Sequence, residues 1–137
     1  MKGIADTGFI VAFLNRSDGH HEWAVEIATK ASEPLLTCEA VLSEAAFNVA
    51  STSRVLALVH EGLLKIAFDL PKNFAEVLEL AERYRDRTPD LADLCLVRMS
   101  ELNANLPIIT VDEADFRIYR KNKREVIPLV CPPRNRH

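Results

Sequence analysis

The chain has little glycine, few cysteines and no long apolar run, and each shortage excludes a class of protein. Four of its 137 residues are glycine, and none lies in a glycine-rich phosphate loop. The longest uncharged stretches (7–15, 45–53 and 102–111) are far shorter than the roughly 20 apolar residues of a membrane-spanning helix. The N-terminus does not resemble a secretory signal, because Asp6 interrupts its apolar run. We therefore expect a cytoplasmic protein.

The three cysteines, Cys38, Cys95 and Cys131, are widely spaced and form no Cys-x-x-Cys pair. An odd number at such spacing argues against a disulfide framework and against a structural zinc site. We expect these side chains to act as small buried hydrophobes.

The balance of charged and apolar residues is that of an ordinary globular protein. Residues 1–137 are expected to form a single domain, with 48% hydrophobic and 27% charged residues. The net charge of −3 is unevenly distributed, because segment 117–137 holds seven Arg or Lys against one acid and is therefore +6. This basic C-terminal segment has two open interpretations: contact with nucleic-acid phosphates, or a solvated charged end.

Short apolar strands alternate with helices along the chain. This alternation predicts an α/β fold in which a central parallel sheet carries helices on both faces. The helix that begins near residue 88 is expected to use Thr88 as its cap and Pro89 as its first residue. The expected strands are 2–5, 34–37, 64–68, 107–111 and 126–130, and the expected helices are 7–14, 18–31, 39–53, 54–62, 71–85, 88–102 and 112–119.

Two acids follow expected strands directly. Asp6 comes after strand 2–5, and Asp112 comes after strand 107–111. Ligands of open parallel sheets bind at the carboxyl ends of the strands, so both acids are candidates for a site. Each also has an ordinary explanation, since either carboxylate is able to cap the helix that follows it.

Two further acids are placed on apolar helix faces. Glu44 is three residues from both Val41 and Phe47. Asp93 precedes the apolar run of its helix, and Asp90 lies one turn earlier on the same face. A carboxylate in such a position is costly unless it is paired or bound to a metal, and no basic partner is evident.

A set of carboxylates without cationic partners predicts a metal site. Oxygen-only ligands suit magnesium or manganese, and such ions promote phosphodiester hydrolysis. No serine has the context of a catalytic nucleophile. His20 and His21 are adjacent and point about 100° apart on a helix, so we expect His21 to have a structural or substrate-side role.

Several motifs occur in the order of a known family. They are Asp6-Thr7-Gly8, Asp18 with His20-His21, Thr37 to Glu44, Asp90-Leu-Ala-Asp93, Thr110-Val-Asp112-Glu-Ala-Asp115-Phe116, and Tyr119-Arg120. The chain thereby resembles the PIN-domain ribonucleases, in particular the VapC-like toxins of type II toxin–antitoxin modules. The resemblance spans nearly the whole chain and implies a three-layer α/β/α domain that cuts single-stranded or loop RNA with magnesium or manganese.

The resemblance also implies roles for individual residues. Asp6, Glu44, Asp93 and Asp112 match the catalytic acids, and Asp6, Asp93 and Asp112 among them match the metal ligands. The supporting residues are Asp90, Asp115, Thr7 and Thr110, whose hydroxyls or carboxylates would orient or flank the ligands. Pro89 and Leu94 depart from the usual Asp-Leu-Ala-Asp context, and neither departure removes a ligand.

The family further implies partners. We expect a small antitoxin protein, a homodimer, and an exposed apolar groove near the N-terminal helices for these contacts. The alternative is a PIN-fold module that binds RNA or protein without catalysis or a toxin role. A phosphate-accepting receiver domain fits less well, because Asp6 is not paired with a second acid and Thr110 occupies the strand end where a lysine is needed.

Overall fold

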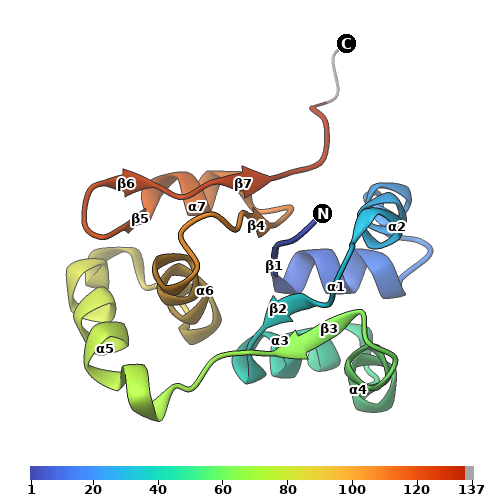
Figure 1. Cartoon of the computed structure of the whole chain (residues 1–137), viewed down its shortest axis with the longest axis horizontal. Helices are drawn as coiled ribbons and strands as arrows, with labels where there is room; N and C mark the ends of the chain where they lie inside the picture. The colour runs from blue at the N-terminus through green and yellow to red at the C-terminus, as the bar shows by residue number, and fades with distance from the viewer. Residues whose placement is uncertain (135–137) are drawn as a thin grey trace.

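The computed structural model describes residues 1–134, in which five short parallel strands form one central sheet (Figure 1). Their order across the sheet is β3-β2-β1-β4-β7, and every neighbouring pair is parallel. The strands are β1 (Ile4–Ala5), β2 (Leu35–Thr37), β3 (Leu64–Ile66), β4 (Ile108–Ile109) and β7 (Leu129–Val130).

Helices flank the sheet and complete a three-layer α/β/α architecture, as the sequence predicts. In the described part of the chain, α1 packs against α2 and α3, whereas α6 packs against α5, α3 and β1. The helices are α1 (Thr7–Leu14), α2 (His21–Lys30), α3 (Glu39–Val49), α4 (Thr52–His60), α5 (Phe74–Arg83), α6 (Leu91–Leu102) and α7 (Glu113–Ile118).

The strand order of the sheet reverses beside β1. The chain builds β1, β2 and β3 outward in one direction and then returns to add β4 and β7 on the other side of β1. The strand order therefore reverses between β1 and β4, whose residues pair as Ala5 with Ile109. Open α/β sheets bind ligands outside the carboxyl ends of strands at such a reversal point.

The core lies between the sheet and its helices. The β1 and β4 residues Ile4, Ile108 and Ile109 are fully buried, as are Phe9 of α1 and Leu96 of α6. Strands buried on both faces read as continuous apolar runs, which explains why they stand out in this sequence. Among residues 1–134, no helix has the length and hydrophobicity needed to cross a lipid bilayer.

The expected start of α6 is wrong by two residues. Asp90, not Thr88, is the cap, and its Oδ1 accepts a hydrogen bond of 2.8 Å from the Asp93 backbone N–H. Thr88 instead adopts a left-handed conformation with φ 45° at the end of a 3-10 turn, η2 (Arg85–Arg87). Because Asp is as good a capping residue as Thr, the motif allowed both assignments.

The expected helix 39–53 is also too long. α3 ends at Val49, because Ala50 is left-handed and Ser51 caps α4 by accepting a hydrogen bond from the Arg54 backbone N–H. Phe47, assigned to the buried face of α3, is instead 86% exposed. The buried stripe of this helix is formed by Val41, Leu42 and Ala45.

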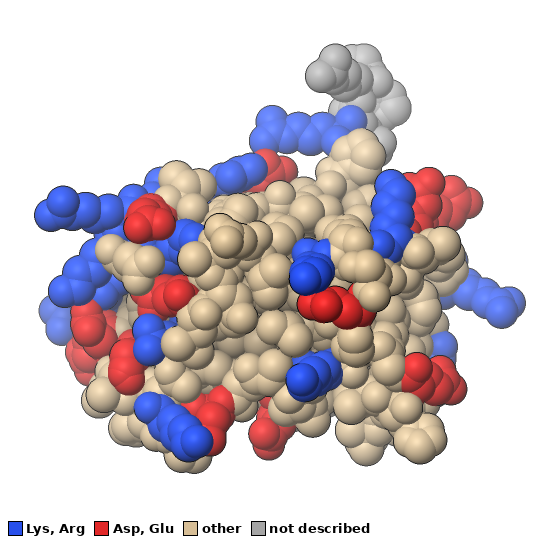
Figure 2. Space-filling view, viewed as in Figure 1, with Lys and Arg blue, Asp and Glu red and all other residues tan. Residues whose placement is uncertain are grey.

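The basic segment begins with a hairpin that was not predicted from the sequence. β5 (Arg120–Lys121) pairs antiparallel with β6 (Glu125–Val126) around a turn in which Asn122 and Lys123 have positive φ. Asn at a left-handed turn position is common, but Lys is not, so the turn signal was weak. Figure 2 shows Lys and Arg gathered over this edge of the molecule, with Asp and Glu between them.

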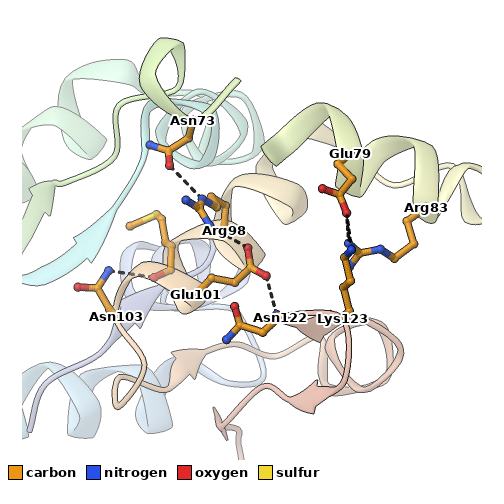
Figure 3. Close-up of polar contacts among 9 residues, drawn as sticks. Asn73, Glu79, Arg83, Arg98, Glu101, Asn103, Asn122 and Lys123 are labelled. Atoms are coloured by element: carbon orange, nitrogen blue, oxygen red, sulfur yellow. Dashed lines mark hydrogen bonds and ion pairs between the residues drawn. The ribbon is translucent and has the colours of Figure 1, made fainter. Parts of the chain in front are cut away.

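Several basic side chains of this segment contact other residues of the protein. Lys121 is buried and donates to the Ala104 carbonyl at 2.8 Å. Lys123 lies 3.7 Å from Glu79 of α5, and the Asn122 backbone N–H donates to Glu101 of α6 (Figure 3). These contacts fasten the hairpin to α5 and α6, so a large part of the basic character has a structural role.

Two of the three cysteines are buried as expected, and Cys131 is not. All three thiols are free; Cys38 and Cys95 are buried in the core, and Cys131 is half-buried.

Candidate active site

Asp6 lies at the carboxyl end of β1 and is buried, with 4% of its surface exposed. Its Oδ1 accepts a 2.5 Å hydrogen bond from the Thr7 backbone N–H at the start of α1. Its Oδ2 accepts a 2.5 Å hydrogen bond from the Thr110 hydroxyl. Asp6 is therefore both the cap of α1 and a carboxylate fixed at the point where the strand order reverses.

Thr110 joins the ends of β1 and β4. This fully buried residue follows β4, donates to Asp6 and accepts a 2.8 Å hydrogen bond from the Asp112 backbone N–H. Asp112 occupies the cap position of α7, yet its carboxylate makes no capping hydrogen bond. Capping therefore does not account for the Asp112 side chain, and this exposed carboxylate remains available.

Glu44 reaches the site from α3. Its Oε1 accepts a 3.2 Å hydrogen bond from the Thr7 hydroxyl, which connects α3 to the start of α1. The side chain is half-buried, at the edge of the apolar stripe rather than within it. Thr7 and Thr110 thus each hold one acid of the candidate site.

The acids of α6 and α7 share a cavity. Asp90, Asp93 and Asp115 line a hollow of about 300 Å³ at the N-terminal end of α6. Asp93 is half-buried, whereas Asp90 and Asp115 are exposed. The Asp93 carboxylate accepts no hydrogen bond within residues 1–134, in contrast to Asp90, which caps the helix.

Burial and repulsion by neighbouring carboxylates raise the pKa values of Asp93 and Asp6. Desolvation raises the pKa of Asp93 to about 8, and the charges of Asp90, Asp6, Asp115 and Glu44 add to the effect. Desolvation also raises the pKa of Asp6 to about 6, although its hydrogen bonds from Thr110 and Thr7 oppose the shift. An acid that is charged at neutral pH only at such cost indicates a place for a cation.

Two further acids of the cluster, Glu44 and Asp112, show the same effect. The pKa values of Glu44 and Asp112 are raised, in both cases first by burial and then by neighbouring carboxylates. The negative charge of Asp90 raises both of these pKa values. The carboxylates of α3, α6 and α7 therefore form one electrostatic cluster. In the described part of the chain, none of the six acids forms an ion pair: Asp6, Glu44, Asp90, Asp93, Asp112 and Asp115.

The oxygen atoms of these six acids are chemically suited to bind a hard divalent cation. All are carboxylate oxygens, which magnesium and manganese prefer. As the side chains lie, no three acids, cysteines or histidines of residues 1–134 form a ready-made metal site. Among residues 1–134 neither the Asp93 nor the Asp112 carboxylate accepts a hydrogen bond, so a cation near Asp6 would displace no protein donor from them.

His20 and His21 lie outside this cluster. A nitrogen of the His21 ring, Nδ1, lies 2.8 Å from the Ala12 carbonyl and must donate to it, because a carbonyl oxygen only accepts. This bond joins α2 to α1, which gives His21 a structural contact. His20 is exposed at the cap position of α2, where its backbone N–H donates to Asp18.

Two residues that line the cavity were not assigned to a site from the sequence. Arg87 and Tyr119 lie beside Asp90, Asp93 and Asp115. The sequence places Tyr119 in a motif without giving it a role, and nothing in the sequence singles out Arg87. No local sequence pattern identifies either residue as part of the cavity. They come together only because α7 and η2 pack around α6.

The family model for the PIN domain matches residues 4–122. The chain therefore belongs to the PIN-domain family, as the motifs predict. PIN domains are generally nucleases that use divalent metal ions, so the family and the acid cluster indicate the same class of activity. A search of curated proteins found none that matches the chain.

Proposed function

We propose that this protein is a magnesium-dependent endoribonuclease that cleaves single-stranded or loop RNA in the cytoplasm. The observation that carries the proposal is the cluster of carboxylates at the reversal point of the sheet, where none is paired with a base among residues 1–134. RNA is the substrate we favour because the resemblance to VapC-like proteins covers motifs in both halves of the chain.

The positions of the acids suggest a different role for each group of them. Asp6, Asp93 and Asp112 would hold the magnesium or manganese ion, and Glu44 would accept a hydrogen bond from the attacking water. Thr7 and Thr110 orient Glu44 and Asp6 through the hydrogen bonds described above. Asp90 and Asp115 add negative charge at the rim.

When bound, a divalent ion of this kind stabilises the charge that develops on a phosphodiester during in-line displacement. The protein supplies the remaining requirements. The buried face of the site excludes water from Asp6, and the hydrogen bonds on this carboxylate fix its direction before any ligand arrives.

The direct test is cleavage of a labelled single-stranded RNA by purified protein. We expect cleavage with magnesium, none with a chelator, and none for Asp6→Asn. Asp86→Asn is the matched control, because Asp86 is an exposed acid outside the cluster, and it should cleave as the wild type does. Cleavage that survives Asp6→Asn would reveal a contaminating nuclease and refute the assignment.

One observation favours a second function, a PIN-fold module that binds RNA or protein without catalysis. The carboxylates of residues 1–134 do not enclose a metal site as they stand. This module would be indifferent to magnesium, whereas a nuclease should show a higher melting temperature when magnesium binds the folded state. Differential scanning calorimetry with and without magnesium separates the two functions.

We further propose that the nuclease is the toxin of a toxin–antitoxin pair and forms a homodimer. A groove of about 730 Å³ between α3 and α4 is lined by Phe47 and Leu56, which are 86% and 51% exposed. An apolar segment of an antitoxin fits this surface better than RNA does, because none of its lining residues is charged.

Co-expression with the product of an adjacent small reading frame should inhibit cleavage. Phe47→Asp should abolish this inhibition and leave RNA cleavage intact, since Phe47 lies outside the acid cluster. A neighbour that does not inhibit the wild type would remove the support for a toxin role. Light scattering of the purified protein tests the dimer independently.

A further inference from the structure

The cavity of the acid cluster has a second wall that is not acidic. Arg87, Thr88 and Pro89 come from the turn before α6, and Ile118 and Tyr119 come from the end of α7. Three of these residues carry side-chain hydrogen-bond donors: the guanidinium of Arg87 and the hydroxyls of Thr88 and Tyr119. They face the same hollow as Asp93, so an occupant would lie between donors and carboxylates.

Tyr119 is buried, with 5% of its surface exposed, but its hydroxyl makes no hydrogen bond within residues 1–134. Its ring packs edge-on against Tyr84 and Phe116, with centroids 5.0 and 5.9 Å away. These contacts fix the ring at the wall of the cavity. The hydroxyl of Tyr84, by contrast, accepts a 2.9 Å hydrogen bond from the Arg120 backbone N–H. A hydroxyl at the wall of a cavity, with no protein partner, is free to donate a hydrogen bond to an occupant that accepts one.

Arg87 is exposed at the rim, and it forms no ion pair with a described residue although three acids line the same cavity. Arg83 and Arg85, on the same stretch of chain, do pair with Glu79 and Glu82. A guanidinium has only donors, so the occupant it selects must be an acceptor, and an anion by preference.

We propose that Arg87 and Tyr119 bind a phosphate of the RNA strand next to the phosphate that is cut. This inference rests on the proposed nuclease function and extends it to the substrate-binding residues. An RNA strand that approaches six carboxylates is strongly repelled. The positive charge of Arg87 and the neutral hydroxyl of Tyr119 reduce this repulsion at the rim of the cavity. Both donors recognise the backbone, so they position RNA without reading its sequence.

Binding of a short fluorescent single-stranded RNA tests the proposal. The Asp6→Asn background keeps the RNA intact while the dissociation constant is measured by anisotropy over a range of salt concentrations. Loss of one phosphate contact lowers the slope of log affinity against log salt by about 0.7 for single strands. We expect this change for Arg87→Gln and an unchanged slope for the matched control Arg85→Gln.

Tyr119→Phe removes only the hydroxyl and keeps the aromatic packing. We expect roughly tenfold weaker RNA binding, the effect of one hydrogen bond to a charged group. Tyr84→Phe is the control, because it removes a neighbouring hydroxyl that is used within the protein, and it should bind RNA as the parent does. Circular dichroism checks that each variant is folded.

The outcomes separate this proposal from the function on which it rests. If the wild type cleaves RNA but both variants keep the parental slope and affinity, the phosphate site is refuted and the nuclease stands. If the wild type neither binds nor cleaves RNA, both proposals fail. Should Tyr119→Phe not fold, the salt slope of Arg87→Gln decides, because that side chain is exposed and its loss leaves the core intact.

Discussion

Replacing Asp93 by asparagine should make the metal-free protein more stable, and increasingly so as the pH rises. The folded protein holds the Asp93 proton up to a pKa of about 8, whereas the unfolded chain releases it near the ordinary value of 3.8. The folded state therefore binds more protons between these values, and the free energy of unfolding falls as the pH rises through this window. An asparagine side chain has no proton to lose, so the variant escapes this decline.

The size of the effect follows from the pKa difference. At 1.36 kcal/mol for each pKa unit, the shift of Asp93 from 3.8 to about 8 corresponds to a limit of about 6 kcal/mol. Asp93 is only half-buried, and water at its open side screens both desolvation and repulsion, so we expect about 2 kcal/mol at pH 8. For a chain of this length, that difference corresponds to about 6 °C in melting temperature.

Thermal unfolding followed by circular dichroism at several pH values, with a chelator present, measures this difference. The control is Asp86→Asn, which should follow the wild type at every pH. Magnesium should raise the melting temperature of the wild type at pH 8 and should raise that of Asp93→Asn much less, because the variant lacks a ligand. A variant that is less stable than the wild type at pH 8 would show that the Asp93 carboxylate is already neutralised, and the reasoning about repulsion would be refuted.

Two substitutions test the scaffold of the site. Thr110→Val keeps the side-chain shape but removes the hydroxyl that donates to Asp6 and accepts from the Asp112 backbone N–H. We expect chemical denaturation to show a free energy of unfolding lower by about 2 kcal/mol, together with a strong loss of cleavage. Wild-type stability would refute the role of this hydroxyl. Gly8→Ala would place a Cβ against the side chain of Val111; we expect about 1–3 kcal/mol of destabilisation and lower activity, and an unchanged melting temperature would show that Val111 moves freely.

The strand-end acids show how far the sequence alone leads. Asp6 and Asp112 were expected at the ends of two strands, and the strand order then placed those two strands side by side. The sequence left capping open for both residues. The structure shows that only one of the two caps a helix through its side chain. Asp6 accepts a hydrogen bond from the first helical residue, whereas the Asp112 carboxylate makes no capping hydrogen bond.

The position of Glu44 was predicted only in part. Helix spacing placed it on a buried face between Val41 and Phe47, but Phe47 is exposed and Glu44 lies at the boundary of the buried stripe. A spacing of three covers about 300° on a helix, so residues three apart share a face only loosely. The half-buried position leaves the Glu44 carboxylate accessible from the open side of the site.

Contacts outside the predicted strand ends and motifs could not be predicted. Arg87 and Tyr119 are 32 positions apart and line one cavity only because the end of α7 packs beside the turn before α6. The hairpin that follows Tyr119 was missed for a related reason. Its turn contains Asn122 and Lys123 instead of a glycine, and its attachment to α5 and α6 depends on side chains far away in sequence.

The acid cluster is a net cost to the folded protein in the absence of a ligand. Raised pKa values at Asp6, Glu44, Asp93 and Asp112 mean that each carboxylate is harder to ionise in the fold than in the unfolded chain. Neutral side chains of similar size would serve packing better, so stability does not explain these residues. A cation that binds the cluster recovers this free energy, and its affinity must therefore rise with pH as the acids lose their protons. Metal binding and folding are coupled through the same carboxylates, which makes magnesium-dependent stability the property that most directly links this fold to its proposed chemistry.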